Sequence, residues 1–149
     1  IIATGTVGPA PAEGFGAEYP GTVTIEEVIY AAREGIGCDF DLSGFLFRAM
    51  GNEPFWMVEI QPGAMVLTRP GSPVVTWPEY AVEKRQDDLV FRGVSPDGEG
   101  TLTIVPEPGR DTMSGAYFAY QARFEMKGET LEGLALKGFP PTQDGPAED

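Results

Sequence analysis

The chain has 149 residues, a formal net charge of −13 and an ordinary apolar content of 42%, enough for one domain with a hydrophobic core. This acidic balance excludes the usual nucleic-acid-binding surfaces, because phosphate binding needs clustered Lys and Arg. The sequence has no histidine and one cysteine, Cys38, which excludes histidine-dependent triads, thiolate metal sites and any intrachain disulfide. We expect Cys38 to be buried, with an intermolecular bridge as the alternative.

Residues 1–22 are rich in Gly, Pro and Ala and carry Phe15 and Tyr19 among a few apolar side chains. Such a composition does not build a core alone, so we expect an extended arm. If the arm is ordered, its apolar residues must be buried against the rest of the domain or against another chain. We predict that a partner covers part of it, and a flexible linker is the alternative.

Residues 24–34 are predicted to form a helix. Thr24 and Glu27 match a capping box, and Val23 and Val28 match a hydrophobic staple. Apolar residues recur at helical spacing, and Gly35 suits a helix C-terminus. A strand over residues 22–30 is the alternative.

The next segment resembles a calcium loop in part. Asp39, Asp41 and Ser43 supply oxygens at alternate positions before Gly44. The position that needs a bidentate glutamate holds Met50, and a strand rather than a second helix is expected after the loop. We therefore predict an ordinary polar turn, with no metal and no other cofactor.

The most distinctive stretch combines a turn with two adjacent aromatic residues: Gly51, Asn52, Glu53, Pro54, Phe55 and Trp56. Pro54 lacks a backbone donor, so a strand can begin only after it. Alternation then places Trp56, Val58 and Ile60 on one face, where Trp56 is expected to anchor the core. Glu53 must face water or pair with an arginine, for which Arg48 and Arg110 are candidates.

The rest of the chain alternates short apolar runs with turn signals. Gln61–Ala64, Ser95–Gly100 and Lys127–Glu129 separate segments that are predicted to form antiparallel pairs. The fold class is therefore mainly β, a small antiparallel barrel or sandwich over residues 23–138 that includes the short helix. Residues 139–149 are expected to form an acidic tail.

Two motifs resemble a family of uncharacterised bacterial envelope proteins, many of them lipoproteins. The first motif is Gly51–Trp56, and the second runs from Asp111 to Gly115, ahead of an aromatic strand and Leu131-Glu132-Gly133. The resemblance implies a periplasmic or extracellular location. The family commonly has one cysteine before the second motif and another after the glycine that corresponds to Gly133, where this chain has residues such as Gly109 and Leu134, so the disulfide that the resemblance implies is absent.

The family is in turn similar to small barrels that inhibit c-type lysozymes through a Ser-Gly-x-x-Tyr motif and a lysine. Ser114 and Gly115 match its start, Tyr117 stands one place early, and Lys127 is the candidate lysine.

We expect a protein that is not an enzyme, because no triad, nucleophile elbow or phosphate loop accompanies its scattered carboxylates. Three functions stay open: an accessory subunit that binds a larger envelope or membrane complex; an inhibitor of a basic hydrolase; and a small-molecule or metal-binding module. The arm favours the first. The candidate partner-binding residues are Phe15, Tyr19, Ser114, Gly115, Tyr117 and Lys127. No partner nucleic acid and no membrane-spanning segment are expected.

Overall fold

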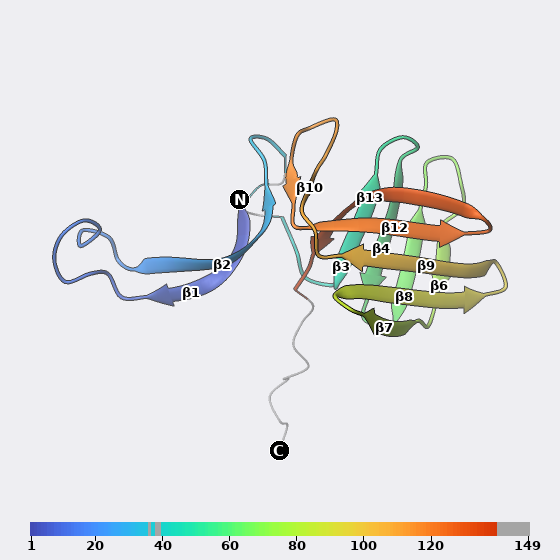
Figure 1. Ribbon diagram of the computed structural model, residues 1–149, viewed down its shortest axis with the longest axis horizontal. Helices are drawn as coiled ribbons and strands as arrows, with labels where there is room; N and C mark the ends of the chain where they lie inside the picture. Colours follow the sequence, from blue (N-terminus) through green and yellow to red (C-terminus); the bar gives the residue numbers. More distant parts are fainter. Residues whose placement is uncertain (36, 38–39, 140–149) are drawn as a thin grey trace, which may run out of the picture.

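The computed structural model describes residues 1–35, 37 and 40–139. In this part of the chain the strands form two antiparallel sheets, one of nine strands and one of four, which confirms the mainly β prediction. Figure 1 shows the larger sheet curled into a half-barrel, with the smaller sheet beside it. Cys38, Asp39 and the acidic tail from residue 140 lie outside the described residues.

The curled sheet has the strand order β6-β5-β4-β3-β13-β12-β9-β8-β7. Most neighbours in this order are consecutive hairpins, and β13 joins the two halves by pairing with both β12 and β3. Its strands are β3 (Phe47–Gly51), β4 (Trp56–Gln61), β5 (Ala64–Thr68), β6 (Val75–Trp77), β7 (Ala81–Arg85), β8 (Asp88–Ser95), β9 (Gly98–Val105), β12 (Tyr120–Met126) and β13 (Glu129–Lys137).

The turns of the curled sheet follow from local chemistry. Gly63 has a φ of 85°, and Gly98 has a φ of 116°. Lys127 and Gly128 both have positive φ, at 51° and 75°, as a two-residue hairpin turn requires. The hairpins expected around these turns are confirmed.

A buried tryptophan closes the open side of the half-barrel. Trp77 of β6 is fully buried and donates its indole N–H to the Gly98 carbonyl at 3.0 Å. Its ring lies on Gly93 and Gly100, which face each other across β8 and β9. A Cβ at Gly93 or Gly100 would lie 2.7 Å or 2.6 Å from the nearest Trp77 atom, so only glycine fits here.

Aromatic rings run through the core of the half-barrel. Phe124 lies between the two tryptophans, with its centroid 6.2 Å from Trp56 and 5.9 Å from Trp77. The alternation predicted for β4 is confirmed, since Trp56, Val58 and Ile60 are buried while Met57 and Glu59 are less so.

The smaller sheet has the order β1-β2-β11-β10. Its strands are β1 (Ile2–Gly8), β2 (Thr22–Ala31), β10 (Gly109–Arg110) and β11 (Tyr117–Phe118). The helix predicted for residues 24–34 is wrong, because this segment is mostly β2, as the alternative had it. Thr22, Val23, Thr24 and Ile25 are β-branched, which disfavours helix and favours a strand. A helix this short is also marginal alone, whereas β1 supplies backbone partners along most of β2.

The start of the expected arm is thus a paired strand. β1 and β2 form a long hairpin, and the intervening loop contains the Gly- and Pro-rich residues 9–21. The register of β1 and β2 is irregular between Ile2 and Ala3 and between Thr4 and Gly5. Figure 1 shows the hairpin pointing away from the curled sheet.

The root of the hairpin is fixed by a second, smaller core. Ile29, Tyr30, Phe45, Phe118 and Leu136 are buried together there. Glu27 adds a polar clasp to the curled sheet: its carboxylate accepts a hydrogen bond from the Tyr120 hydroxyl at 2.6 Å and lies 3.6 Å from the Lys137 ammonium. Burial, followed by the hydrogen bond to Glu27, raises the pKa of Tyr120.

Candidate functional site

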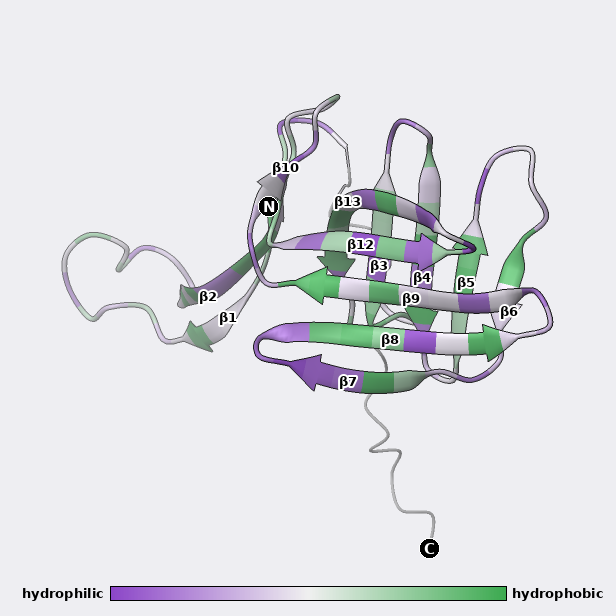
Figure 2. Cartoon of the chain, turned by 45° about the vertical axis from the view of Figure 1, so that its right-hand side comes forward, coloured by the Kyte–Doolittle hydropathy of each residue, from purple (hydrophilic) through white to green (hydrophobic). Residues whose placement is uncertain are grey.

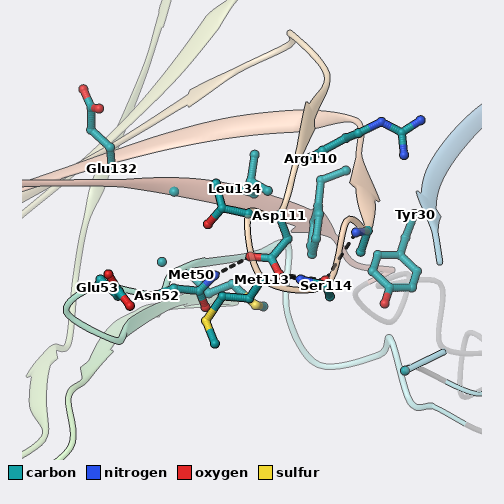
Figure 3. A pocket seen from close by; sticks show the side chains of 16 residues that line it. Tyr30, Met50, Asn52, Glu53, Arg110, Asp111, Met113, Ser114, Glu132 and Leu134 are labelled. Carbon is teal, nitrogen blue, oxygen red and sulfur yellow. Dashed lines mark hydrogen bonds between the residues drawn. The ribbon is translucent and has the colours of Figure 1, made fainter. Parts of the chain in front are cut away.

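The two sequence motifs meet at one pocket, which we call the motif pocket. It has a volume of about 770 Å³ and lies between the start of the β3–β4 turn, the β10–β11 loop and β13 (Figure 3). Apolar side chains contribute part of the wall, and polar or charged ones the remainder; the wall includes Tyr30, Met50, Asn52, Glu53, Arg110, Asp111, Met113, Ser114, Phe118, Glu132 and Leu134.

Asp111 joins the two motifs. One of its carboxylate oxygens accepts a hydrogen bond from the Asn52 side-chain amide. The other accepts from the Ser114 amide and the Ser114 hydroxyl, both at 2.7 Å. The Gly115 amide also donates to the Asp111 carbonyl at 2.8 Å. The second motif is therefore a tight loop that Asp111 organises and that Asn52 fastens to the β3–β4 turn (Figure 3).

These contacts hold Asp111 in its charged form. Hydrogen bonds from the Ser114 side chain and backbone, with a smaller contribution from Asn52, lower the pKa of Asp111. A carboxylate whose oxygens accept this many hydrogen bonds is suited to organising a loop, and poorly suited to taking a proton from a substrate.

Asp111→Asn is expected to lower the free energy of unfolding by about 1–3 kcal/mol at neutral pH, because hydrogen bonds from Ser114 and Asn52 to a charged acceptor are lost. The folded carboxyl has a lower pKa than the unfolded one. Its stabilisation is therefore present above the ordinary Asp pKa of about 3.9 and is lost as the pH falls through the folded value. Urea denaturation at several pH values should show the two proteins converging in acid.

Asp87→Asn is the matched control, since Asp87 is an exposed turn residue and the change in charge is the same. It should shift stability by no more than about 0.5 kcal/mol. A loss that stays constant down to acid pH would contradict the role given to the Asp111 charge.

The other residues of the first motif divide between core and surface. Trp56 is buried, and its indole N–H donates to the Glu132 carbonyl at 3.4 Å. Glu53 and Pro54 are exposed, and Phe55 is 46% exposed. Glu53 faces water rather than an arginine. Of the two candidate partners, Arg48 pairs with Glu59 at 2.9 Å, and Arg110 donates to the Gly115 carbonyl at 3.1 Å.

The residues matched to lysozyme inhibitors do not gather at one place. Ser114 and Gly115 lie in the exposed loop beside the motif pocket, and the half-buried Tyr117 pairs with Ala31 in the small sheet. Lys127 lies beyond the far end of β12, in the turn to β13. Gly109 and Leu134, where the resembled family has cysteines, are in contact: a Cβ at Gly109 would lie 2.5 Å from a Leu134 methyl carbon.

Asp41 and Ser43 form a polar turn, as the sequence predicts. The Ser43 amide and hydroxyl donate to one Asp41 oxygen at 2.8 Å and 2.6 Å, and these bonds lower the pKa of Asp41. Among the described residues no group of three or more acidic, Cys or His side chains is placed to hold a metal ion. Over the same residues no helix has the length and apolar character needed to cross a bilayer.

Five of the exposed large apolar side chains in the described part of the chain lie on the hairpin, whereas each of the two motifs exposes one, Phe55 or Met113. We call residues 5–25 the distal hairpin; none of them is buried. Phe15 is 96% exposed in its loop, and Tyr19 is also exposed. Val7 pairs with Val23, and Ile25 follows on the same face, with exposures of 81%, 68% and 56%.

The opposite face of the distal hairpin is polar. Thr6 pairs with Thr24, and Thr22 pairs with Gly8. The sequence did not predict the apolar face of Val7, Val23 and Ile25, because Val7 was expected in an extended arm, Val23 just before a helix and Ile25 on that helix. The alternation of Thr and Val or Ile from residue 22 to residue 25 is the signal that predicts it once a strand is assumed.

No protein family, no curated protein and no solved structure matches the chain.

Proposed function

We propose that this chain is a non-enzymatic, protein-binding accessory subunit of a larger assembly, and that the distal hairpin is its docking element. The observation that carries the proposal is the exposed apolar face of Val7, Val23 and Ile25, together with Phe15 at the tip. An isolated two-stranded hairpin is marginally stable in water, and a covered apolar face is what normally stabilises one. A partner would supply that cover.

The energetic gain from such docking is substantial. Burying a Val, Ile or Phe side chain contributes about 1.5–3 kcal/mol relative to leaving it in water. The hairpin exposes four such side chains, Val7, Phe15, Val23 and Ile25, that are available as anchors for a partner.

The charge of the hairpin indicates what kind of partner surface it fits. Residues 1–32 contain four acidic side chains, Glu13, Glu18, Glu26 and Glu27, and no Lys or Arg. A complementary partner has an apolar patch with basic residues around it, because opposite charges favour both encounter and correct alignment. The resemblance of the two motifs to envelope proteins supports a periplasmic or extracellular site for this assembly.

The alternatives receive different support. A lysozyme-type inhibitor needs its serine loop and lysine on one surface, whereas Ser114 lies in the β10–β11 loop of the small sheet and Lys127 lies in the β12–β13 turn of the curled sheet. A small-molecule binder is favoured by the motif pocket, whose volume falls within the usual range for ligand sites.

The docking proposal is tested with a photoreactive phenylalanine placed at position 15 or 23 of the protein in its native cells. We expect one discrete adduct of higher mass on irradiation. Position 82 is the matched control, because Val82 is an apolar residue with 55% exposure on the charged strand β7, and it should give no adduct.

The same experiment is repeated with substitutions on the hairpin. Val7→Ser and Ile25→Ser should weaken the adduct at position 15, while Thr24→Ser on the polar face should leave it unchanged. An adduct that forms equally at positions 15 and 82, or that survives both apolar-face substitutions, would rule out specific docking through this face.

A further inference from the structure

The outer edge of the small sheet is the least protected sheet edge in the described part of the chain. The small sheet has the edge strands β1 and β10, and the curled sheet has the edge strands β6 and β7. Strand β10 has two residues and β6 has three. β7 carries Glu83, Lys84 and Arg85, which colour its arrowhead purple in Figure 2. Shortness and charge are the usual means by which a sheet edge avoids pairing with another chain.

Strand β1 has neither form of protection. It has seven residues, Ile2–Gly8, with no charged side chain and no proline. One of its edges bonds to β2. Within the described residues the backbone groups of its other edge have no backbone partner. Such a row of donors and acceptors is a template for a further strand.

We propose that the partner adds a strand to β1, so that the small sheet gains a fifth strand when the assembly forms. This inference rests on the proposed function, since it specifies how the distal hairpin binds. The added strand would satisfy the free backbone groups of β1 while its side chains extend the two faces of the hairpin.

The two faces of the hairpin indicate which kinds of residue alternate along the added partner strand. Next to Val7 and Val23 the partner strand needs apolar side chains, and next to Thr6 and Thr24 it needs polar ones. The strand therefore alternates apolar and polar residues. Lys or Arg at its ends would face the acidic surroundings set by Glu13, Glu18 and Glu26.

A second copy of this chain is the less suitable occupant. Each chain has a formal net charge of −13, and each hairpin is acidic without a basic residue. Pairing two β1 strands would bring these like charges together, which opposes association. A strand from a basic partner has the opposite sign.

The test uses a short probe peptide that alternates Val and Thr between terminal lysines. A matched peptide has the same side chains with every backbone amide N-methylated, so that neither of its edges can donate hydrogen bonds to β1. Hydrogen exchange of the β1 amides is followed for the whole protein with each peptide at millimolar concentration. Exchange of the amides on the free edge of β1 should slow at least about tenfold with the first peptide only, while the β7 amides should not change.

Equal protection by both peptides, or protection by neither, would overturn strand addition. Crosslinking at position 15 could still succeed in that case, so the proposed docking face would stand without the strand. Slow exchange of β1 amides without any peptide, together with a dimer in sedimentation, would instead overturn the choice of a foreign partner.

Discussion

Trp77→Ala is expected to lower the free energy of unfolding by about 3–5 kcal/mol, the usual cost of deleting a large buried aromatic side chain. Trp77 is fully buried, contacts Phe124 edge-to-face and caps the Gly98 carbonyl. It also joins β6 to β8 and β9, which do not hydrogen-bond to β6. Its loss therefore removes the contact that holds the open side of the half-barrel together.

The glycines under the ring make this prediction specific. Gly100→Ala should lower the free energy of unfolding by about 1–3 kcal/mol in the parent, because the new methyl group overlaps the indole. In the Trp77→Ala background the same change should cost little, since the space above Gly100 is then empty. This double-mutant cycle separates the cost of overlap with Trp77 from any cost of alanine in β9 that does not depend on Trp77.

Urea denaturation monitored by tryptophan fluorescence measures these effects, with Trp56 as the reporter that remains in the Trp77→Ala background. Val94→Ala is the control in the same hairpin, because Val94 is 71% exposed and should change stability by no more than about 0.5 kcal/mol. Equal costs for Gly100→Ala in both backgrounds would show that Trp77 does not determine the glycine.

The curled sheet could be predicted from the sequence because its signals are local. Pro-Gly and Lys-Gly turns, with alternating runs on both sides, specify hairpins whose partners are adjacent in the chain. The pairing of β13 with β3 is not local, because most of the domain's sequence lies between Phe47 and its partner Lys137. No turn signal encodes that contact. The sequence therefore predicted the fold class, an antiparallel barrel or sandwich, but not the strand order of the curled sheet.

The hairpin was mispredicted because two local patterns compete over the same residues. Thr24 and Glu27 match a helix cap, yet Glu27 instead binds Tyr120 and Lys137. Pairing with β1 favours a strand over a helix here. The Gly and Thr residues of β1 make that segment hard to recognise as a strand from the sequence. Propensity gave way to tertiary pairing here, as it commonly does for short segments.

The motif pocket likewise depends on contacts between residues that are far apart in the sequence. Both motifs were visible in the sequence, and Asp111 and Asn52 were in them. Their hydrogen bond joins residues that are 59 positions apart, a relation that no spacing rule supplies. The exposed face of the distal hairpin depends on the β1–β2 register, which is likewise a property of the folded chain.

Trp56→Ala is expected to cost about 3–5 kcal/mol, as for Trp77, and to loosen the motif pocket as well. The Trp56 ring packs on Phe124 and reaches Gly51 and Gly133, where a Cβ would overlap the indole at Gly51 and lie 3.0 Å from it at Gly133. Gly51, Gly133 and the Glu132 residue that accepts its N–H all line the pocket. The side chain therefore supports the pocket wall from behind.

Phe55→Ala is the control for Trp56→Ala, because Phe55 is the adjacent aromatic residue and is half-exposed. It should cost no more than about 1 kcal/mol. Unfolding is followed by the fluorescence of Trp77, and the pocket by the side-chain amide resonances of Asn52 in NMR spectra. We expect the Asn52 resonances to move in Trp56→Ala and to stay in place in Phe55→Ala. An unchanged denaturation midpoint in Trp56→Ala would mean that the first motif does not anchor the core, and unchanged Asn52 resonances would mean that the core and the pocket are independent.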